Sequence, residues 1–284
     1  MKNTGFLCYF LVALVVVSSM VGLFYSSGEK RFSVENIYGE TIELYGDGVY
    51  RYNSVLKATG NKGTDLVMLL VALLFAFFTA RWQKGKRSRY IHLGLLAGLL
   101  YYSACLVFGV TFNRLFLVYV LQFSVSLFAM IFLLTDLLRE GHLSRSLIGR
   151  SLKGTAVFLL ICGSSVLIWL EFILPALLTG QPPSTIEVYT TEPTFVLDLA
   201  IVLPVYVGCG IALLRRKALG YELAPILLTF ITIIGVTVIG QNVFQVSAGV
   251  DIPLRQLFGL VVSFVVLGAI ASILNVRLWL QTKQ

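Results

Sequence analysis

Long apolar runs separated by short polar segments are the dominant pattern of this 284-residue chain. Each run is roughly 20 residues long, which as a helix is enough to cross the ~30 Å hydrocarbon core of a bilayer. The pattern predicts eight spans, at residues 5–25, 64–80, 90–110, 115–138, 152–174, 195–214, 223–240 and 254–274. The expected fold is therefore all-α, an eight-helix transmembrane bundle that forms one membrane domain over residues 1–284.

The longest polar segment, residues 26–63, follows the first apolar run. Residues 40–45 and 49–52 alternate apolar and polar side chains, and Gly46, Asp47 and Gly48 between them favour a turn with positive φ angles. This predicts a small extracytoplasmic β-hairpin, then a short helical turn at 53–58 and a loop at 59–63. The second helix starts at 64, and helices two to eight occupy 64–284. The segment 175–194, which contains Pro182 and Pro183, is expected to be irregular.

Composition agrees with lipid as the main solvent of this chain. Hydrophobic residues make up 57% of it and charged residues 13%, with a mean hydropathy of +0.88. An alternative interpretation of the first run is a cleaved signal peptide. Its length, and the lack of a small residue at the −3 position before Ser27, favour an uncleaved helix.

Charge sets an orientation for the eight spans. If the N-terminus is inside, 15 of the 22 Lys and Arg residues but only 3 of the 14 acids fall in inner segments. Positively charged inner loops are the general rule for membrane proteins. The sequence thus predicts a multi-pass protein of the cell inner (cytoplasmic) membrane with both termini cytoplasmic. Because the basic residues are explained by the bilayer, no nucleic-acid partner is expected.

Two segments suggest an internal duplication. Residues 109–116 (GVTFNRLF) precede the fourth span, and residues 249–258 (GVDIPLRQLF) precede the eighth. Each brings an arginine to the same side of the membrane, which would fit two parallel four-helix repeats. Chance likeness between short loops is the alternative.

Ionisable residues within or beside the spans are the natural candidates for a site, because charge is costly in lipid. Glu171 and Asp198 are the deepest, Asp65 opens the second span, and Arg114 and Arg255 start the fourth and eighth. All five are predicted in one outer layer. They would form a pocket for a polar or ionic ligand, or else pair with one another as structural groups.

Polar stripes within the apolar spans add two amides to these candidates. Gln122 shares a helix face with Tyr119 and Ser126, and Gln241 shares one with Thr237. In lipid, such groups either bond between helices or line a cavity.

Three further features concern helix packing. Gly94 and Gly98 form a GxxxG that predicts a close helix contact, and Pro204 predicts a kink six residues after Asp198. The four cysteines lie in apolar spans without metal or redox spacing. No cofactor motif is present, so neither a cofactor nor a metal is expected.

Four stretches resemble segments of an uncharacterised family of bacterial multi-pass integral membrane proteins. They are residues 62–66 (KGTDL), 112–119 (FNRLFLVY), 197–204 (LDLAIVLP) and 220–225 (GYELAP). The resemblance spans most of the chain. It implies a bacterial cytoplasmic-membrane setting and gives weight to Asp65, Arg114 and Asp198, but it implies no activity, ligand or catalytic residue.

The leading functional hypothesis is a transporter, or receptor-like binder, of a small polar or ionic solute with its site in the outer half of the bundle. Glu171 and Asp198 would bind a cation or exchange protons, and Arg114 and Arg255 would pair with them or hold an anion. One alternative is a non-catalytic accessory or assembly subunit of a membrane complex, with membrane partner subunits. A second is an intramembrane enzyme acting on a lipid headgroup, with the two acids facing a shared cleft.

Overall fold

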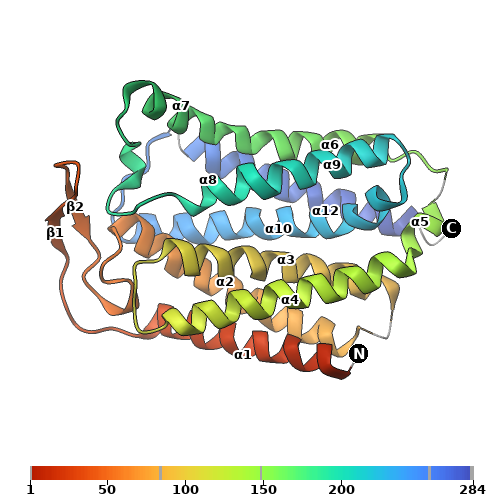
Figure 1. The fold of residues 1–284 in the computed structure, drawn as a ribbon, viewed down its shortest axis with the longest axis horizontal. Helices are drawn as coiled ribbons and strands as arrows, with labels where there is room; N and C mark the ends of the chain where they lie inside the picture. Colours follow the sequence, from red (N-terminus) through yellow and green to blue (C-terminus); the bar gives the residue numbers. More distant parts are fainter. Residues whose placement is uncertain (1, 83–84, 148, 255–256, 282–284) are drawn as a thin grey trace.

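The computed structural model describes residues 2–82, 85–147, 149–254 and 257–281. Within these ranges, eight helical stretches are long and apolar enough to cross a membrane by length and composition. This confirms the predicted all-α bundle and the number of spans. The helices run side by side along the long axis of the molecule, with the β-hairpin at one end and both termini at the other (Figure 1). We call these the hairpin end and the termini end.

The first half of the chain contains α1 (Lys2–Phe24), β1 (Phe32–Glu35), β2 (Thr41–Leu44), the 3₁₀ turn η1 (Gly48–Tyr50), α2 (Val55–Ala80), α3 (Lys86–Gly109), α4 (Phe116–Glu140) and the short α5 (His142–Leu147). The second half contains α6 (Lys153–Ser165), η2 (Val166–Trp169), α7 (Leu170–Thr179), η3 (Ser184–Ile186), α8 (Pro193–Leu197), the π-helical turn η4 (Asp198–Val202), α9 (Leu203–Leu214), α10 (Ala218–Ser247), the π-helical turn η5 (Leu257–Val262) and α12 (Ser263–Gln281).

Helix α10 is the centre of the bundle, since it packs against α2, α3, α9 and α12. Its contact with α2 is backbone to backbone: a Cβ atom on Gly63 would lie 2.3 Å from the Gly240 carbonyl oxygen. The predicted close contact at the GxxxG also occurs here, because Gly94 and Gly98 lie against α10 side chains. Small residues thus bring α2, α3 and α10 close together along the bundle.

The hairpin differs from the predicted one. β1 and β2 pair antiparallel from Phe32 opposite Leu44 to Glu35 opposite Thr41. The turn is set by Asn36, whose Oδ1 accepts the amides of Tyr38 at 3.0 Å and Glu40 at 2.9 Å. The predicted pairing of 40–45 with 49–52 is therefore wrong, because this Asx turn closes the hairpin earlier in the chain.

The predicted turn residues Gly46, Asp47 and Gly48 have a different role. Both glycines have positive φ, as expected, but they lead into η1 instead of joining two strands. The Asp47 carboxylate accepts the amides of Ser27 at 2.6 Å and Gly48 at 2.8 Å. These bonds fasten the segment to the end of α1, which leaves residues 49–52 unavailable for a strand.

Helix α2 begins at Val55, so the predicted loop at 59–63 is wrong. Ser54 caps the helix by accepting the Lys57 amide. In the sequence, the polar residues of the first two turns of α2 indicate a loop. In the fold, Lys57 forms an ion pair with Glu192 and Lys62 donates to the Leu23 carbonyl, so their charges do not prevent these turns from packing.

Two spans of the second half are locally irregular. The fifth passes through η2 into α7, which includes Pro175, so the irregular segment begins after Thr179. In the sixth, the turn before Pro204 is π-helical, and the Leu203 amide bonds to the Asp198 carbonyl. Proline has no amide hydrogen to bond to Ala200. The irregularity predicted near Pro204 is therefore present as a π turn that starts at Asp198.

Candidate functional site

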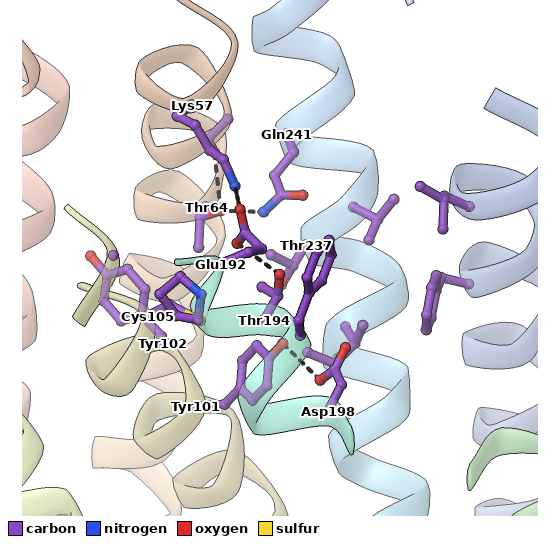
Figure 2. A pocket seen from close by; sticks show the side chains of 18 of the residues that line it. Lys57, Thr64, Tyr101, Tyr102, Cys105, Glu192, Thr194, Asp198, Thr237 and Gln241 are labelled. Carbon is purple, nitrogen blue, oxygen red and sulfur yellow. Dashed lines mark hydrogen bonds and ion pairs between the residues drawn. The ribbon is translucent and has the colours of Figure 1, made fainter. Parts of the chain in front are cut away.

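A cavity of about 350 Å³ lies in the hairpin-end half of the bundle. Its walls come from α2, α3, α8 with η4, and α10, and it extends to the turns η2 and η5. Figure 2 shows polar side chains from these elements pointing toward one another across it. The volume falls within the range of small-molecule sites, and most of its lining is apolar, as is usual for such sites.

An ion pair lies at one side of the cavity. Lys57 of α2 bonds through Nζ to Glu192 Oε2, and Thr194 Oγ1 donates to Glu192 Oε1 at 2.8 Å (Figure 2). The Glu192 side chain is 7% exposed. It precedes Pro193, which starts α8, so its position is fixed by a helix that begins there. The two charges compensate each other within the wall.

Amide side chains of α10 form a second polar wall. Gln241 Nε2 donates to Thr64 Oγ1 at 2.8 Å, and Gln245 Nε2 donates to the Leu56 carbonyl at 3.2 Å. Asn242 Nδ2 donates to the Val238 carbonyl, and its buried Oδ1 has no partner within the described part of the chain. The sequence-predicted Gln241 thus lines the cavity beside an unused acceptor.

Asp198 is the third charged residue that lines the cavity, and its side chain is 7% exposed. One carboxylate oxygen accepts the Tyr101 hydroxyl at 2.9 Å, and the other accepts Trp169 Nε1 at 2.7 Å. Both donors are neutral, and no ion pair to Asp198 is found among residues 2–82, 85–147, 149–254 and 257–281. The carboxylate is therefore fixed in position and has no cation partner within the described part of the chain.

Aromatic rings surround this carboxylate. The centroids of Trp169 and Phe195 lie 5.1 Å apart, and those of Tyr101 and Phe230 lie 5.6 Å apart. All four rings line the same cavity as Asp198. The region is thus an acidic group within apolar and aromatic walls.

Asp65, by contrast, does not line the cavity. It is fully buried, and its two oxygens accept the hydroxyls of Tyr50 at 2.8 Å and Tyr102 at 2.6 Å. A Cβ atom on Gly22 of α1 would lie 2.0 Å from Asp65 Oδ2, so this side of the carboxylate is closed by a helix. Tyr102 does line the cavity and therefore separates Asp65 from it.

Gln122 belongs to a neighbouring polar network between helices. Its Oε1 accepts Ser18 Oγ at 2.7 Å, and its Nε2 donates to Ser103 Oγ at 3.0 Å. It is fully buried and does not line the cavity. Its surroundings are those of a polar group that joins α1, α3 and α4.

The other sequence candidates are not brought together. Glu171, in the first turn of α7, is exposed and does not line the cavity, and Arg114 is exposed at the hairpin end. Arg255 lies outside the described residues. Asp65 and Asp198 bond to aromatic hydroxyl and indole groups, not to arginine. Among the described members of the predicted outer layer, only Asp198 lines the cavity; the separate candidate Gln241 lines it as well.

A further acid, Glu187, lies outside the spans and bonds to Ser54 near Tyr189, which lines the cavity; we call this region the mouth of the cavity. Ser54 Oγ donates to its Oε2 at 2.5 Å, and the nearby Tyr189 hydroxyl donates to Asn53 Oδ1 at 3.0 Å. Burial raises the pKa of Glu187 above its usual value, although the Ser54 bond and the Lys57 charge oppose this. Burial likewise raises the pKa of Tyr189.

Sequence reasoning missed Lys57, Glu192, Tyr101 and Trp169 as site residues. Two signals were present: an acid directly before the proline that starts a span, and adjacent tyrosines within the otherwise apolar third span. Neither signal names a partner, because Lys57 and Glu192 are 135 positions apart.

The described residues contain no group of three or more His, Cys, Asp or Glu side chains able to hold a metal ion. The chemistry that the cavity offers is recognition: one uncompensated carboxylate, an ion pair, amide groups and aromatic faces. Comparisons with protein-family models, curated proteins and solved structures found no match to this chain.

Proposed function

We propose that this protein is a transporter, or a receptor-like binder, of a small polar or ionic solute that occupies the cavity in the hairpin-end half of the bundle. The observation that carries the proposal is the cavity of about 350 Å³ with a buried Asp198 on its wall that has no cation partner among the described residues. A carboxylate in such surroundings is costly unless it binds something, which makes it a functional group by default. Asp198 would bind the solute or a proton, while Lys57 and Glu192 would define the opposite polar side.

The second proposed element is the orientation of the bundle. The termini end carries most of the Lys and Arg residues, so we place it in the cytoplasm of a cell with the protein in its inner membrane. The hairpin end, and with it the mouth near Glu187, would then face outward. Cysteines introduced at Asp47 should react with an impermeant thiol reagent in whole cells, and cysteines at Lys86 should not. The reverse pattern would invert the proposal.

A parallel four-plus-four repeat remains part of this proposal. The neighbour pairs α1–α2, α2–α3 and α3–α4 have counterparts in α6–α9, α9–α10 and α10–α12. The repeat would place α3 and α10, which pack together, at the interface of the halves. Such an interface is where transporter sites are commonly found.

Lipid-headgroup chemistry by a pair of acids is less well supported. It requires Glu171 and Asp198 to face one cleft, whereas Asp198 lines the cavity and Glu171 does not. The geometry therefore favours recognition of a solute over catalysis by these two residues.

The chain contains its own probe of the cavity. Cys105 and Cys162 line it, while Cys8 and Cys209 do not. A variant that keeps only Cys105, with the other three changed to alanine, should react with a small charged thiol reagent, since an aqueous solute site must admit water. A variant that keeps only Cys209 is the matched control and should stay unreactive. Equal inertness of the two variants would contradict an accessible solute site.

A further inference from the structure

The net charge of the cavity wall limits what the cavity can bind. The charged residues that line it within the described ranges are Lys57, Glu192 and Asp198. Lys57 and Glu192 compensate each other in an ion pair, so the Asp198 carboxylate is left without a counterion among the residues that the structure describes. Because an isolated charge is very costly in a low-dielectric interior, a cation or a proton is expected beside it.

The groups around Asp198 disfavour an inorganic cation. Calcium, for example, takes six to eight oxygen ligands, and magnesium requires near-octahedral oxygen coordination. The Asp198 oxygens already accept bonds from Tyr101 and Trp169, and Phe195 and Phe230 contribute ring faces instead of oxygens. The described residues also hold no cluster of potential metal ligands.

The same groups suit a cation with organic character. Aromatic faces attract ammonium groups by cation–π interaction, most strongly when water is excluded. A hydrogen-bonded carboxylate beside the rings adds charge attraction. Asn242 also lines the cavity, and its buried Oδ1 has no donor within the described chain. The remaining apolar lining can hold a hydrocarbon substituent.

We propose that the solute is an organic ammonium ion with an apolar substituent, whose charged group lies beside the Asp198 carboxylate in the part of the cavity that the rings of Trp169, Phe195, Tyr101 and Phe230 line. This inference rests on the proposed solute site and names the class of solute that it takes. The rings give selectivity over sodium and potassium ions, which keep their hydration shells more strongly, and Asp198 gives selectivity over neutral and anionic molecules.

The test measures binding of three matched probes to the purified full-length chain in detergent, by calorimetry and by ligand-induced change in melting temperature. The probes are 2-phenylethylammonium, the neutral 2-phenylethanol and the anionic 3-phenylpropionate, with sodium chloride as an ionic control. The ammonium probe should bind at millimolar concentration or below and raise the melting temperature, whereas the other additions should have little effect.

Substitutions of cavity residues test whether the ammonium probe binds in the cavity. Asp198→Asn should weaken binding of the ammonium probe at least about tenfold. Phe195→Leu should weaken its binding about three- to tenfold, because one ring face is lost. Glu171→Gln is the matched control, because it also removes an acid at the hairpin end but does not line the cavity. Phe195→Leu and the melting curve without ligand keep the test decisive if Asp198→Asn fails to fold.

The outcomes separate this inference from the proposed function. Binding of the neutral probe as tightly as the ammonium probe, or preferred binding of the anion, would overturn the ammonium assignment and leave the solute site standing. Absence of binding by every probe would overturn the ammonium assignment. Combined with an unreactive Cys105, it would overturn the solute site as well. Ammonium binding that survives Asp198→Asn and Phe195→Leu would also overturn the assignment, because the cation would then bind elsewhere.

Discussion

Asp65 and Asp198 are both buried carboxylates of the hairpin-end half, and each is held by two aromatic donors, yet their surroundings differ. Asp65 is enclosed by α1, with Gly22 against one oxygen and tyrosine hydroxyls against both. Asp198 starts a π turn and lines a cavity. The hydrogen bonds alone therefore do not identify the functional acid. What distinguishes the two residues is whether space for a ligand lies beside the carboxylate.

The contrast extends to the backbone that carries each residue. Asp65 lies in a regular helix and is fully buried, whereas Asp198 lies where the helical hydrogen bonding shifts by one residue before Pro204. π turns are rare overall, but those that occur are often found at functional sites. We therefore regard the Asp65 region as a structural support for α1 and the Asp198 region as the recognition site. Two predictions test this division, and a third concerns the pH dependence of Glu187. They are ordered from the largest expected effect to the smallest.

The largest effect is expected from Gly22→Ala. The added Cβ would lie 2.0 Å from Asp65 Oδ2 and 2.9 Å from the Tyr50 hydroxyl oxygen. Relieving this overlap must displace α1 or break the carboxylate bonds, at a cost of about 3 kcal/mol. A large fall in melting temperature and in the yield of monodisperse protein should follow.

Gly208→Ala is the control for that experiment, since a Cβ atom there meets nothing within 4 Å. It should leave the melting temperature unchanged or raise it slightly, because alanine favours helix. A Gly22→Ala protein as stable as Gly208→Ala would show that α1 is not closed against Asp65.

A smaller effect should separate the two acids directly. Asp65→Asn should cost about 1.5–3 kcal/mol, because the amide cannot accept bonds from both Tyr50 and Tyr102 without rearrangement. Asp198→Asn should cost less than about 1 kcal/mol, because the cavity beside it leaves room for the new amide to rearrange, and it should weaken solute binding at least about tenfold. Thermal melts with and without ligand measure both quantities. Equal destabilisation by the two substitutions would break the division.

The smallest effect concerns pH at the mouth of the cavity. The raised pKa of Glu187 means that the folded protein holds this proton more tightly than the unfolded chain does. Its contribution to stability is thus fully present below the usual pKa of about 4.5 and is lost as the pH rises through the folded-state value.

Glu187→Gln should remove this dependence and change the melting temperature by less than about 2 °C, since the side chain is partly exposed. Melting curves across this pH range, with wild type and variant in parallel, measure the difference. An unchanged pH profile would contradict the assigned burial of Glu187.

The pH dependence expected from Asp47 is opposite to that of Glu187. Burial raises the pKa of Asp47, but hydrogen bonds from Ser26, Ser27 and Gly48 lower it overall. The contribution of Asp47 to stability is therefore lost as the pH falls.

The sequence was sufficient for the eight spans, because hydropathy depends on local composition alone. It was also sufficient to single out Asp198, an acid within an apolar run. It misplaced the start of α2, since Lys57 and Lys62 read as loop residues until their partners across the fold are known. The hairpin register was wrong because Asn36 competes with Gly46 and Gly48 as a turn former.

The dependence on partners far apart in the sequence also explains why only part of the site was predicted. Glu171 and Asp198 have similar sequence surroundings, but helix rotation at η2 and η4 decides which one faces the cavity. Trp169 and Tyr101 become site residues only through their bonds to Asp198. Rotational phase and long-range pairing are tertiary properties, which apolar patterns do not encode residue by residue.

The backbone contact between Gly63 and Gly240 has a mechanical consequence. Two helices that touch without intervening side chains cannot approach further, and separating them would lose the close van der Waals packing that holds membrane helices together. This contact therefore acts as a fixed pivot on one side of the cavity. Helix α7 has no buried residue in the structure. Any widening that admits a solute is expected to occur on the α7 side of the cavity, away from this contact.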